Sequence, residues 1–319
     1  NFITKGLNFF NRLFTLKKIL KSDEIDLCIS FGERCNLLTM LAGGKSKKIL
    51  TIHSQLSIEN RSKGIYGYIS SLATKFLYNK ADRIVCVAGI VKNDLVNNFN
   101  IKNDIVSVIY NGHDLEQIKA LSCYDENLIT VDLISVGRIT YAKGHWHMLR
   151  ALSEVKKAYP NITLTIVGGY ELDDVKSSLD IIIEYFNLKN NVNFVGFNDN
   201  PYKFMRNSKV FLLSSIFEGF PGVVIEAISL GLPVVSSDSG GATEICPNDN
   251  IYNKAIHITP KFSGELLTTE PLLDSEIVFA EKIIEVLDNN KNYNFDDIAD
   301  NYSINKMISS YESLLEGVK

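Results

Sequence analysis

The feature that most constrains the fold of this 319-residue chain is a repeated alternation of short apolar runs with helical stretches. Each apolar run is continuous and does not alternate with polar residues, as expected of strands that helices cover on both faces. This alternation predicts parallel sheets in an α/β fold. The expected strands are 25–30, 48–53, 83–87, 105–109, 130–136, 163–167, 192–195, 209–213 and 233–236.

The expected helices precede, separate and follow these strands. They lie at 7–21, 66–79, 91–99, 142–158, 175–186, 201–207, 221–230 and 305–316. The alternation loosens over 114–128, a polar stretch of mixed charge that we interpret as a linker. Two α/β units of this kind predict two Rossmann-like domains that face each other across a cleft. We expect an N-terminal acceptor-side domain at 1–115, a C-terminal nucleotide-sugar domain at 116–304, and a C-terminal helix at 305–319 that can pack back on the first domain.

The bulk composition narrows the class of protein. The chain is long enough for two domains, and its net charge of −4 argues against a nucleic-acid partner. Its five cysteines are odd in number and scattered, which argues against a disulfide framework or a zinc site and favours the reducing cytoplasm. No apolar run reaches the ~18 residues of a membrane-spanning helix, and residues 1–21 lack the pattern of a signal peptide.

Residues 208–226 join a buried strand to a helix through a loop with two glycines and a proline. Backbone N–H groups at such a helix start attract phosphate, and Gly219 and Gly222 would let a diphosphate approach the backbone closely. Glu218 lies before the helix and Glu226 lies inside it, eight residues further on. Both carboxylates can therefore point at one ligand and accept hydrogen bonds from sugar hydroxyls, which suits a nucleotide sugar.

Each of these carboxylates also has a simpler interpretation. Glu218 can be a helix-capping acid, and Glu226 can be a solvated helix residue. The second interpretation fits poorly because Glu226 lies among the apolar residues of 223–228. A lone carboxylate there is costly unless it has a hydrogen-bonding partner.

A second candidate element follows the strand at 130–136 and precedes the helix at 142–158. Arg138 and Lys143 place two cations five residues apart at the carboxyl edge of a sheet, where α/β folds bind ligands. Two such cations could neutralise a leaving diphosphate. Cationic pairs beside glycine are common surface features, so this interpretation depends on the loop at 218–226.

The motifs of the C-terminal half resemble those of a known family. The strings are GRITYAKG, LTIVGG, NVNFVGF and SSIFEGFPGVVIEAISLGLPVVSSDSGGATEI. They are similar to the C-terminal domain of the family 4 retaining glycosyltransferases (glycosyl transferases group 1), which have the GT-B fold. The strings IDLCISF, ILTIHS, ADRIVCVAGIVKNDL and VIYNGHD resemble successive N-terminal segments of that family. The resemblance covers 25–245 and is most specific over 131–245.

The resemblance implies a role for each residue of the two loops. Arg138 and Lys143 would bind the donor diphosphate, Glu218 the hydroxyls of the donor sugar, and Glu226 the ribose. A lone histidine at the end of a strand usually has no functional role. The resemblance, however, implies that His53 lines the catalytic cleft near the donor sugar. The backbone at the helix start would hold the sugar and the phosphate; this group is Gly219, Phe220, Pro221, Gly222, Val223 and Val224. A further loop would border the base; this group is Gly196, Phe197 and Asn198.

The implied reaction moves a hexose or N-acetylhexosamine from a nucleotide sugar, UDP-linked by expectation, to a hydroxyl of a glycan or polyprenyl-diphosphate-linked acceptor. It retains the anomeric configuration and belongs to O-antigen or other polysaccharide assembly. No Asp-x-Asp pair lies in a suitable loop, so we expect no metal and no other cofactor, and the two cations would replace the metal. A UDP-sugar epimerase of the same fold and a non-catalytic donor-binding accessory subunit stay open as alternatives.

Two further expectations concern the N-terminal part. The family begins with a Gly-rich βαβ unit that has no counterpart here, so we expect the natural protein to be longer and this domain to be incomplete. Residues 7–21 and 63–80 combine aromatic residues with lysines. Such surfaces rest on the inner face of the cytoplasmic membrane in proteins that bind it peripherally. Core helices whose lysines extend to the surface explain the same pattern.

Overall fold

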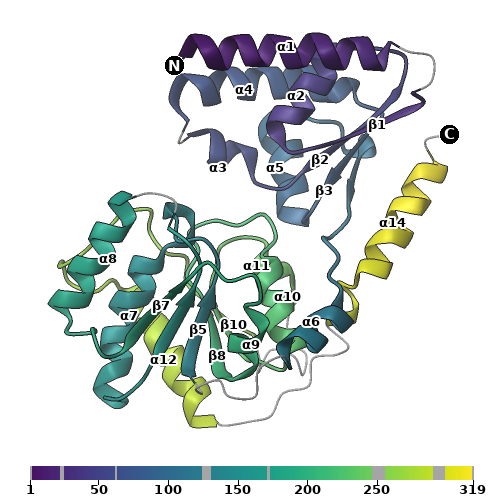
Figure 1. The fold of residues 1–319 in the computed structure, drawn as a ribbon. Coiled ribbons are helices and arrows are strands. Elements are labelled where there is room, and N and C mark those ends of the chain that lie inside the picture. The colour runs from purple at the N-terminus through teal and green to yellow at the C-terminus, as the bar shows by residue number, and fades with distance from the viewer. Residues whose placement is uncertain are drawn as a thin grey trace. The chain divides into compact units, whose positions relative to one another are not determined.

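The computed structural model describes residues 2–21, 25–61, 63–123, 131–170, 173–245, 256–289 and 299–317. The chain divides into two compact units: residues 1–111 with 307–319, and residues 112–306. Each unit is an α/β structure built on one parallel sheet (Figure 1). The fold class predicted from the continuous apolar runs is therefore confirmed for both units.

The first unit contains a four-stranded parallel sheet in the order β1-β2-β3-β4. Its strands are β1 (Leu27–Phe31), β2 (Lys47–Ile52), β3 (Arg83–Cys86) and β4 (Val106–Val108). The central strands are buried, with Ile49, Leu50, Ile84 and Val85 each 0% exposed. Its helical elements are α1 (Phe2–Leu20), α2 (Glu33–Ala42), α3 (Leu56–Arg61), α4 (Gly64–Leu77), η1 (Tyr78–Lys80), α5 (Gly89–Phe99), η2 (Asn103–Ile105) and most of α14 (Ile304–Glu316).

The second unit contains a six-stranded parallel sheet in the order β10-β9-β8-β5-β6-β7. Its strands are β5 (Val131–Val136), β6 (Leu164–Val167), β7 (Val192–Gly196), β8 (Ser208–Leu213), β9 (Val234–Ser237) and β10 (Ile256–Thr259). Its helical elements are α6 (Leu115–Ser122), η3 (Tyr141–Lys143), α7 (His145–Ala158), α8 (Asp173–Tyr185), α9 (Tyr202–Arg206), α10 (Gly222–Ser229), α11 (Ala242–Ile245) and α12 (Asp274–Asn289).

The strand order of the second unit reverses between β5 and β8. The chain builds outward from β5 through β6 to β7, then returns to the other side of β5 with β8 and builds outward again to β10. In an open parallel sheet, the crevice at the carboxyl ends of the two strands that flank such a reversal is where ligands bind. The loops after β5 and β8 are the two that carry the predicted site residues.

The predicted strands are all present, with bounds that differ from the prediction by at most two residues. The linker prediction is wrong over its described part, because residues 115–122 form helix α6. Asp114 caps this helix by accepting a hydrogen bond from the Gln117 N–H at 3.0 Å. The helix packs against α9 and α10, and its residue Ile118 is buried. The remainder of that stretch, 124–130, lies outside the described residues. The sequence prediction also omitted α2, α3, α11, α12 and β10.

Candidate functional site

The loop after β5 and the loop after β8 are bonded directly to each other. The Ser214 hydroxyl donates to the Lys143 carbonyl at 2.9 Å, and the Ile216 N–H donates to the Ala142 carbonyl at the same distance. Gly144 has a φ of 57°, and a Cβ there would lie 2.3 Å from the Ser214 carbonyl oxygen. A side chain at this position would force the loops apart, so the glycine keeps the end of η3 against the end of β8.

This contact brings the predicted cation and the first predicted carboxylate together. Lys143 Nζ lies 2.6 Å from Glu218 Oε1, and the Ser215 hydroxyl donates to the same oxygen at 2.6 Å. Both charged side chains are mostly buried, since 24% of the Lys143 side chain and 15% of the Glu218 side chain are exposed. Lys143 therefore neutralises Glu218. A diphosphate bound here would compete with Glu218 for that ammonium group.

Helix α10 begins immediately after this carboxylate. Pro221 precedes the first helical residue, Gly222, and the Val224 N–H donates to the Pro221 carbonyl at 3.0 Å. The Val224 N–H therefore has a partner within the protein, and its contact with a ligand stays a prediction. Gly222 and Val223 are half-buried at the helix start, where a helix favours an anion.

A hollow of 350 Å³ lies between the two loops. It is lined by Val136, Gly137, Arg138, Lys143, Glu218, Phe220, Pro221, Gly222, Val223 and Glu226. The structure thus brings together both predicted cations, both predicted carboxylates and the start of α10. Arg138 is exposed at its rim. Gly219 is buried between the lining residues Glu218 and Phe220, but does not itself line the hollow.

Three further predicted residues lie at the end of β7 and directly after it. Gly196 has a φ of 78° and Phe197 is 83% exposed. Asn198 accepts a hydrogen bond from the Asn200 N–H at 2.9 Å. A Cβ on Gly169, beyond the end of β6, would lie 3.8 Å from the Phe197 Cβ, so this loop is adjacent to the next strand of the sheet. None of the three lines the 350 Å³ hollow, and their contact with a base stays a prediction.

Glu226 has a neighbour that the sequence did not predict. Its Oε1 lies 3.7 Å from Nδ1 of His113, a residue of the same unit. The His113 ring lies against the first residue of α10, since a Cβ on Gly222 would be 2.7 Å from its Cε1. A lone histidine gives no sequence signal of this contact. His113 lies in the string VIYNGHD, whose resemblance to a family segment does not indicate this contact.

The two members of this pair titrate away from their ordinary values. Burial raises the pKa of Glu226 to about 7, and burial lowers the pKa of His113. The His113 Nε2 atom is buried without a hydrogen-bond partner among the described residues. Glu226 therefore faces the hollow as a carboxyl group whose charge is poorly compensated, in contrast to Glu218.

His53 belongs to the first unit and follows the last residue of β2. Its Nε2 lies 3.0 Å from the Thr51 hydroxyl oxygen, and its ring centroid lies 6.1 Å from that of Phe31. Burial lowers the pKa of His53. The ring is therefore neutral at physiological pH.

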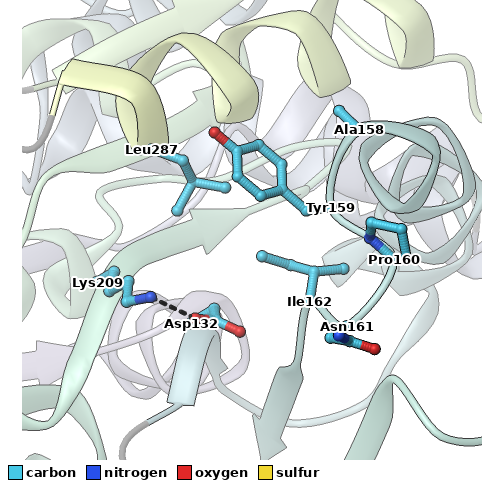
Figure 2. Close-up of a pocket in the computed structure, with 8 residues that line it drawn as sticks. All are labelled: Asp132, Ala158, Tyr159, Pro160, Asn161, Ile162, Lys209 and Leu287. Carbon is cyan, nitrogen blue, oxygen red and sulfur yellow. Dashed lines mark hydrogen bonds and ion pairs between the residues drawn. The ribbon is translucent and has the colours of Figure 1, made fainter.

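A separate hollow of 590 Å³ lies near the opposite ends of the strands of the second unit (Figure 2). Asp132 near the start of β5 and Lys209 near the start of β8 lie in it and form an ion pair of 2.7 Å. The other carboxylate oxygen of Asp132 accepts bonds from the Thr163 N–H and hydroxyl. The charges of Asp132 and Lys209 therefore compensate each other, and none of the predicted site residues lines this hollow.

The described residues contain no group of three or more His, Cys, Asp or Glu side chains arranged to hold a metal ion. Within the same ranges, no helix has the length and apolar character required to cross a bilayer.

The chain belongs to the glycosyl transferases group 1 family. The model of that family matches residues 126–297, and the model of Glycosyltransferase Family 4 matches residues 2–117. The chain is 31% identical to an uncharacterized glycosyltransferase of Methanocaldococcus jannaschii, over 96% of this chain and 83% of that protein. It is also 31% identical to the N-acetylgalactosamine-N,N'-diacetylbacillosaminyl-diphospho-undecaprenol 4-alpha-N-acetylgalactosaminyltransferase of Campylobacter jejuni, over 73% of this chain and 63% of that protein. The protein is thus a glycosyltransferase.

Solved structures support the same fold. HepE of Anabaena in complex with UDP-glucose gives a TM-score of 0.76 at 18% identity, over 96% of this chain and 82% of that chain. The lipopolysaccharide outer core galactosyltransferase WaaB gives a TM-score of 0.67 at 17% identity, over 98% of this chain and 81% of that chain. The predicted family membership and GT-B fold are confirmed.

Proposed function

We propose that this glycosyltransferase transfers a hexose or N-acetylhexosamine from a UDP-sugar to a hydroxyl of a lipid-linked glycan, with retention of configuration. The observation that carries the proposal is the meeting of Lys143, Glu218 and Glu226 around one hollow at the strand-order reversal. The proposed donor agrees with the UDP-glucose complex of HepE. The proposed acceptor agrees with the diphospho-undecaprenol substrate named for the Campylobacter relative.

The donor would bind with its diphosphate at Lys143, Arg138 and the start of α10. When the diphosphate draws Lys143 away, Glu218 loses its cation and becomes an acceptor for hydroxyls of the donor sugar. Glu226, which lines the same hollow, would accept hydrogen bonds from the ribose hydroxyls. As the glycosidic bond breaks, negative charge develops on the leaving diphosphate. Preorganised cations and helix N–H groups stabilise such developing charge most strongly in a partly buried site.

The reaction as proposed needs no metal or other cofactor, because Lys143 and Arg138 supply the positive charge that a divalent ion would otherwise bring to the diphosphate. The test is transfer in excess EDTA, and loss of turnover that Mg²⁺ or Mn²⁺ restores would contradict it. The anomeric configuration of the product, read by NMR, tests retention.

The central experiment measures release of nucleoside diphosphate from a panel of UDP- and GDP-sugars with a polyprenyl-diphosphate-linked glycan as acceptor. Glu218→Ala is expected to abolish transfer. The matched control is Glu184→Ala, which removes an exposed carboxylate from α8 in the same unit. Near-normal turnover of Glu218→Ala would sink the assignment. Isomerisation of a UDP-sugar without an acceptor would favour the epimerase, and donor binding without turnover would favour the accessory subunit.

We also propose that the first unit binds an anionic membrane surface. Helix α4 carries a stripe of exposed apolar side chains at helical spacing: Ile65, Ile69, Leu72 and Phe76 are 81%, 59%, 39% and 68% exposed. Helix α1 carries Phe14, 67% exposed, and two lysines in its last turn. Exposed apolar residues beside lysines match the composition of helices that lie in a bilayer interface.

Flotation with anionic vesicles tests this proposal. Ile69→Ser combined with Phe76→Ser is expected to reduce binding, since each removes an exposed apolar side chain that would enter the interface. Ile181→Ser is the control, because Ile181 is a comparably exposed residue of α8 in the second unit, 48% exposed. Failure of the unaltered protein to float at low salt would refute the proposal.

A further inference from the structure

A buried hydrogen-bond network lies behind His53 in the first unit. Ser30 at the end of β1, Asn36 in α2 and Thr51 in β2 are 6%, 0% and 0% exposed. The Ser30 hydroxyl donates to Asn36 Oδ1 at 2.6 Å, and Asn36 Nδ2 donates to the Thr51 carbonyl at 2.8 Å. Asn36 thereby ties the side chain of one strand to the backbone of the next. Both ends of its amide are used, which fixes its orientation.

The network also fixes the direction of the Thr51 hydroxyl. Thr51 Oγ1 lies 3.0 Å from the Ser30 carbonyl oxygen, to which it donates, and 3.0 Å from His53 Nε2. A hydroxyl has one hydrogen to donate. Since the carbonyl can only accept, the hydrogen of Thr51 is directed at Ser30, and the hydroxyl oxygen faces His53 as an acceptor.

The opposite arrangement leaves two oxygens in contact. If Thr51 donated to His53, its oxygen would face the Ser30 carbonyl at 3.0 Å with no hydrogen between them. A buried acceptor without its donor costs more than an ordinary hydrogen bond gains. Because burial lowers the pKa of His53 and keeps the ring neutral, the ring has one N–H donor and one acceptor nitrogen.

We infer that Thr51, held by Ser30 and Asn36, is a positioning residue that fixes His53 as the tautomer with Nε2 protonated, so that His53 presents Nδ1 to the substrate as a hydrogen-bond acceptor. His53 is only partly buried, so its ring is accessible, and Nδ1 has no partner among the described residues. A bare ring nitrogen accepts a hydrogen bond from a sugar hydroxyl and repels the oxygens of a diphosphate. The contact with the substrate rests on the proposed function and on the place that the family resemblance gives to His53; the tautomer rests on neither.

Nitrogen-15 NMR of the imidazole rings tests the tautomer in the free protein. The spectrum holds signals from five histidines, and His53→Gln identifies the one that disappears. We expect His53 to show a protonated Nε2 and an unprotonated Nδ1. Thr51→Val should populate the other tautomer, because the acceptor is gone, and Thr51→Ser should restore the original pattern. A protonated Nδ1, or a doubly protonated ring at neutral pH, overturns the inference whatever the activity of the protein.

A pair of substitutions tests the use of Nδ1. Asn at position 53 places an amide oxygen close to where Nδ1 lies, whereas Gln places its amide close to Nε2. For transfer, we expect His53→Asn to retain a kcat/KM about tenfold above that of His53→Gln, the value of roughly one hydrogen bond. Equal values, or a better His53→Gln, refute the acceptor role at Nδ1 while leaving the tautomer and the donor site to their own tests.

Discussion

The substitution Glu226→Gln should stabilise the free protein at alkaline pH. Burial raises the pKa of this carboxyl from 4.5 to about 7, and 20% of its side chain is exposed. A group whose pKa is raised by folding stabilises the protein fully below its ordinary pKa. It loses that contribution as the pH rises through the folded value. Wild-type protein should therefore lose stability between roughly pH 4.5 and pH 7 from this group.

The magnitude follows from the size of the pKa change. Each pKa unit corresponds to about 1.4 kcal/mol, so the complete loss is on the order of 3 kcal/mol. Glutamine has the shape of the protonated carboxyl and no charge at any pH. The free energy of unfolding of Glu226→Gln should thus exceed that of the wild type by about 3 kcal/mol near pH 8.5, and by less than about 1 kcal/mol near pH 5.

The chain offers a specific probe for this measurement. Trp146 is the single tryptophan of the chain, is 0% exposed, and belongs to the core of the second unit. Glu226 lies in the same unit. Urea titrations followed by its fluorescence therefore report the unfolding of that unit. Glu218→Gln is the control. It leaves Lys143 without its partner at 2.6 Å, so it should destabilise the unit at pH 8.5. A stability gain of Glu226→Gln that is equal at both pH values refutes the reasoning.

Three further substitutions probe the same unit. Gly222→Ala places a Cβ 2.7 Å from His113 Cε1, and should cost about 1–3 kcal/mol in urea unfolding, which His113→Ala should largely restore. Lys143→Met leaves Glu218 uncompensated and should weaken UDP binding in calorimetry by about tenfold or more. Arg150 in α7 donates two hydrogen bonds, of 2.8 and 3.0 Å, to the fully buried carboxylate of Glu276 in α12. Arg150→Met removes both bonds and should destabilise the unit by about 3–5 kcal/mol in the same fluorescence assay.

The strands were predictable because both sheets are parallel and covered. Such strands contain continuous apolar runs that end where polar loops begin, and Val210–Leu213 in β8 is an example. Helix α6 was not predictable in the same way. It carries Leu115, Ile118 and Leu121 at helical spacing, but the run is short and lies within a polar stretch of mixed charge. Its packing against α9 and α10 is contained in no local pattern.

The donor loops were predictable for a related reason. Glu218, Lys143 and the start of α10 lie next to buried strands, so the position of each at the carboxyl edge of the sheet follows from the strand pattern. Their pairing did not follow, since Lys143 and Glu218 are joined by hydrogen bonds of Ser214, Ser215 and Ile216 that only the folded loops create. His113 was missed because its contact with Glu226 depends on the missing Cβ of Gly222.

The two glutamates of this site are therefore unequal, although the sequence presents them as a symmetrical pair. Glu218 accepts from an ammonium group and a hydroxyl, whereas Glu226 lies 3.7 Å from the ring of His113. Under the proposed function, a donor must exchange partners at Glu218 and must favour ionisation at Glu226, where hydroxyls that donate to the carboxylate stabilise its charged form. Binding of the donor should accordingly release a proton near neutral pH. Under the same proposal, one carboxylate gives up its cation to the diphosphate, and the other gives up its proton when the ribose binds.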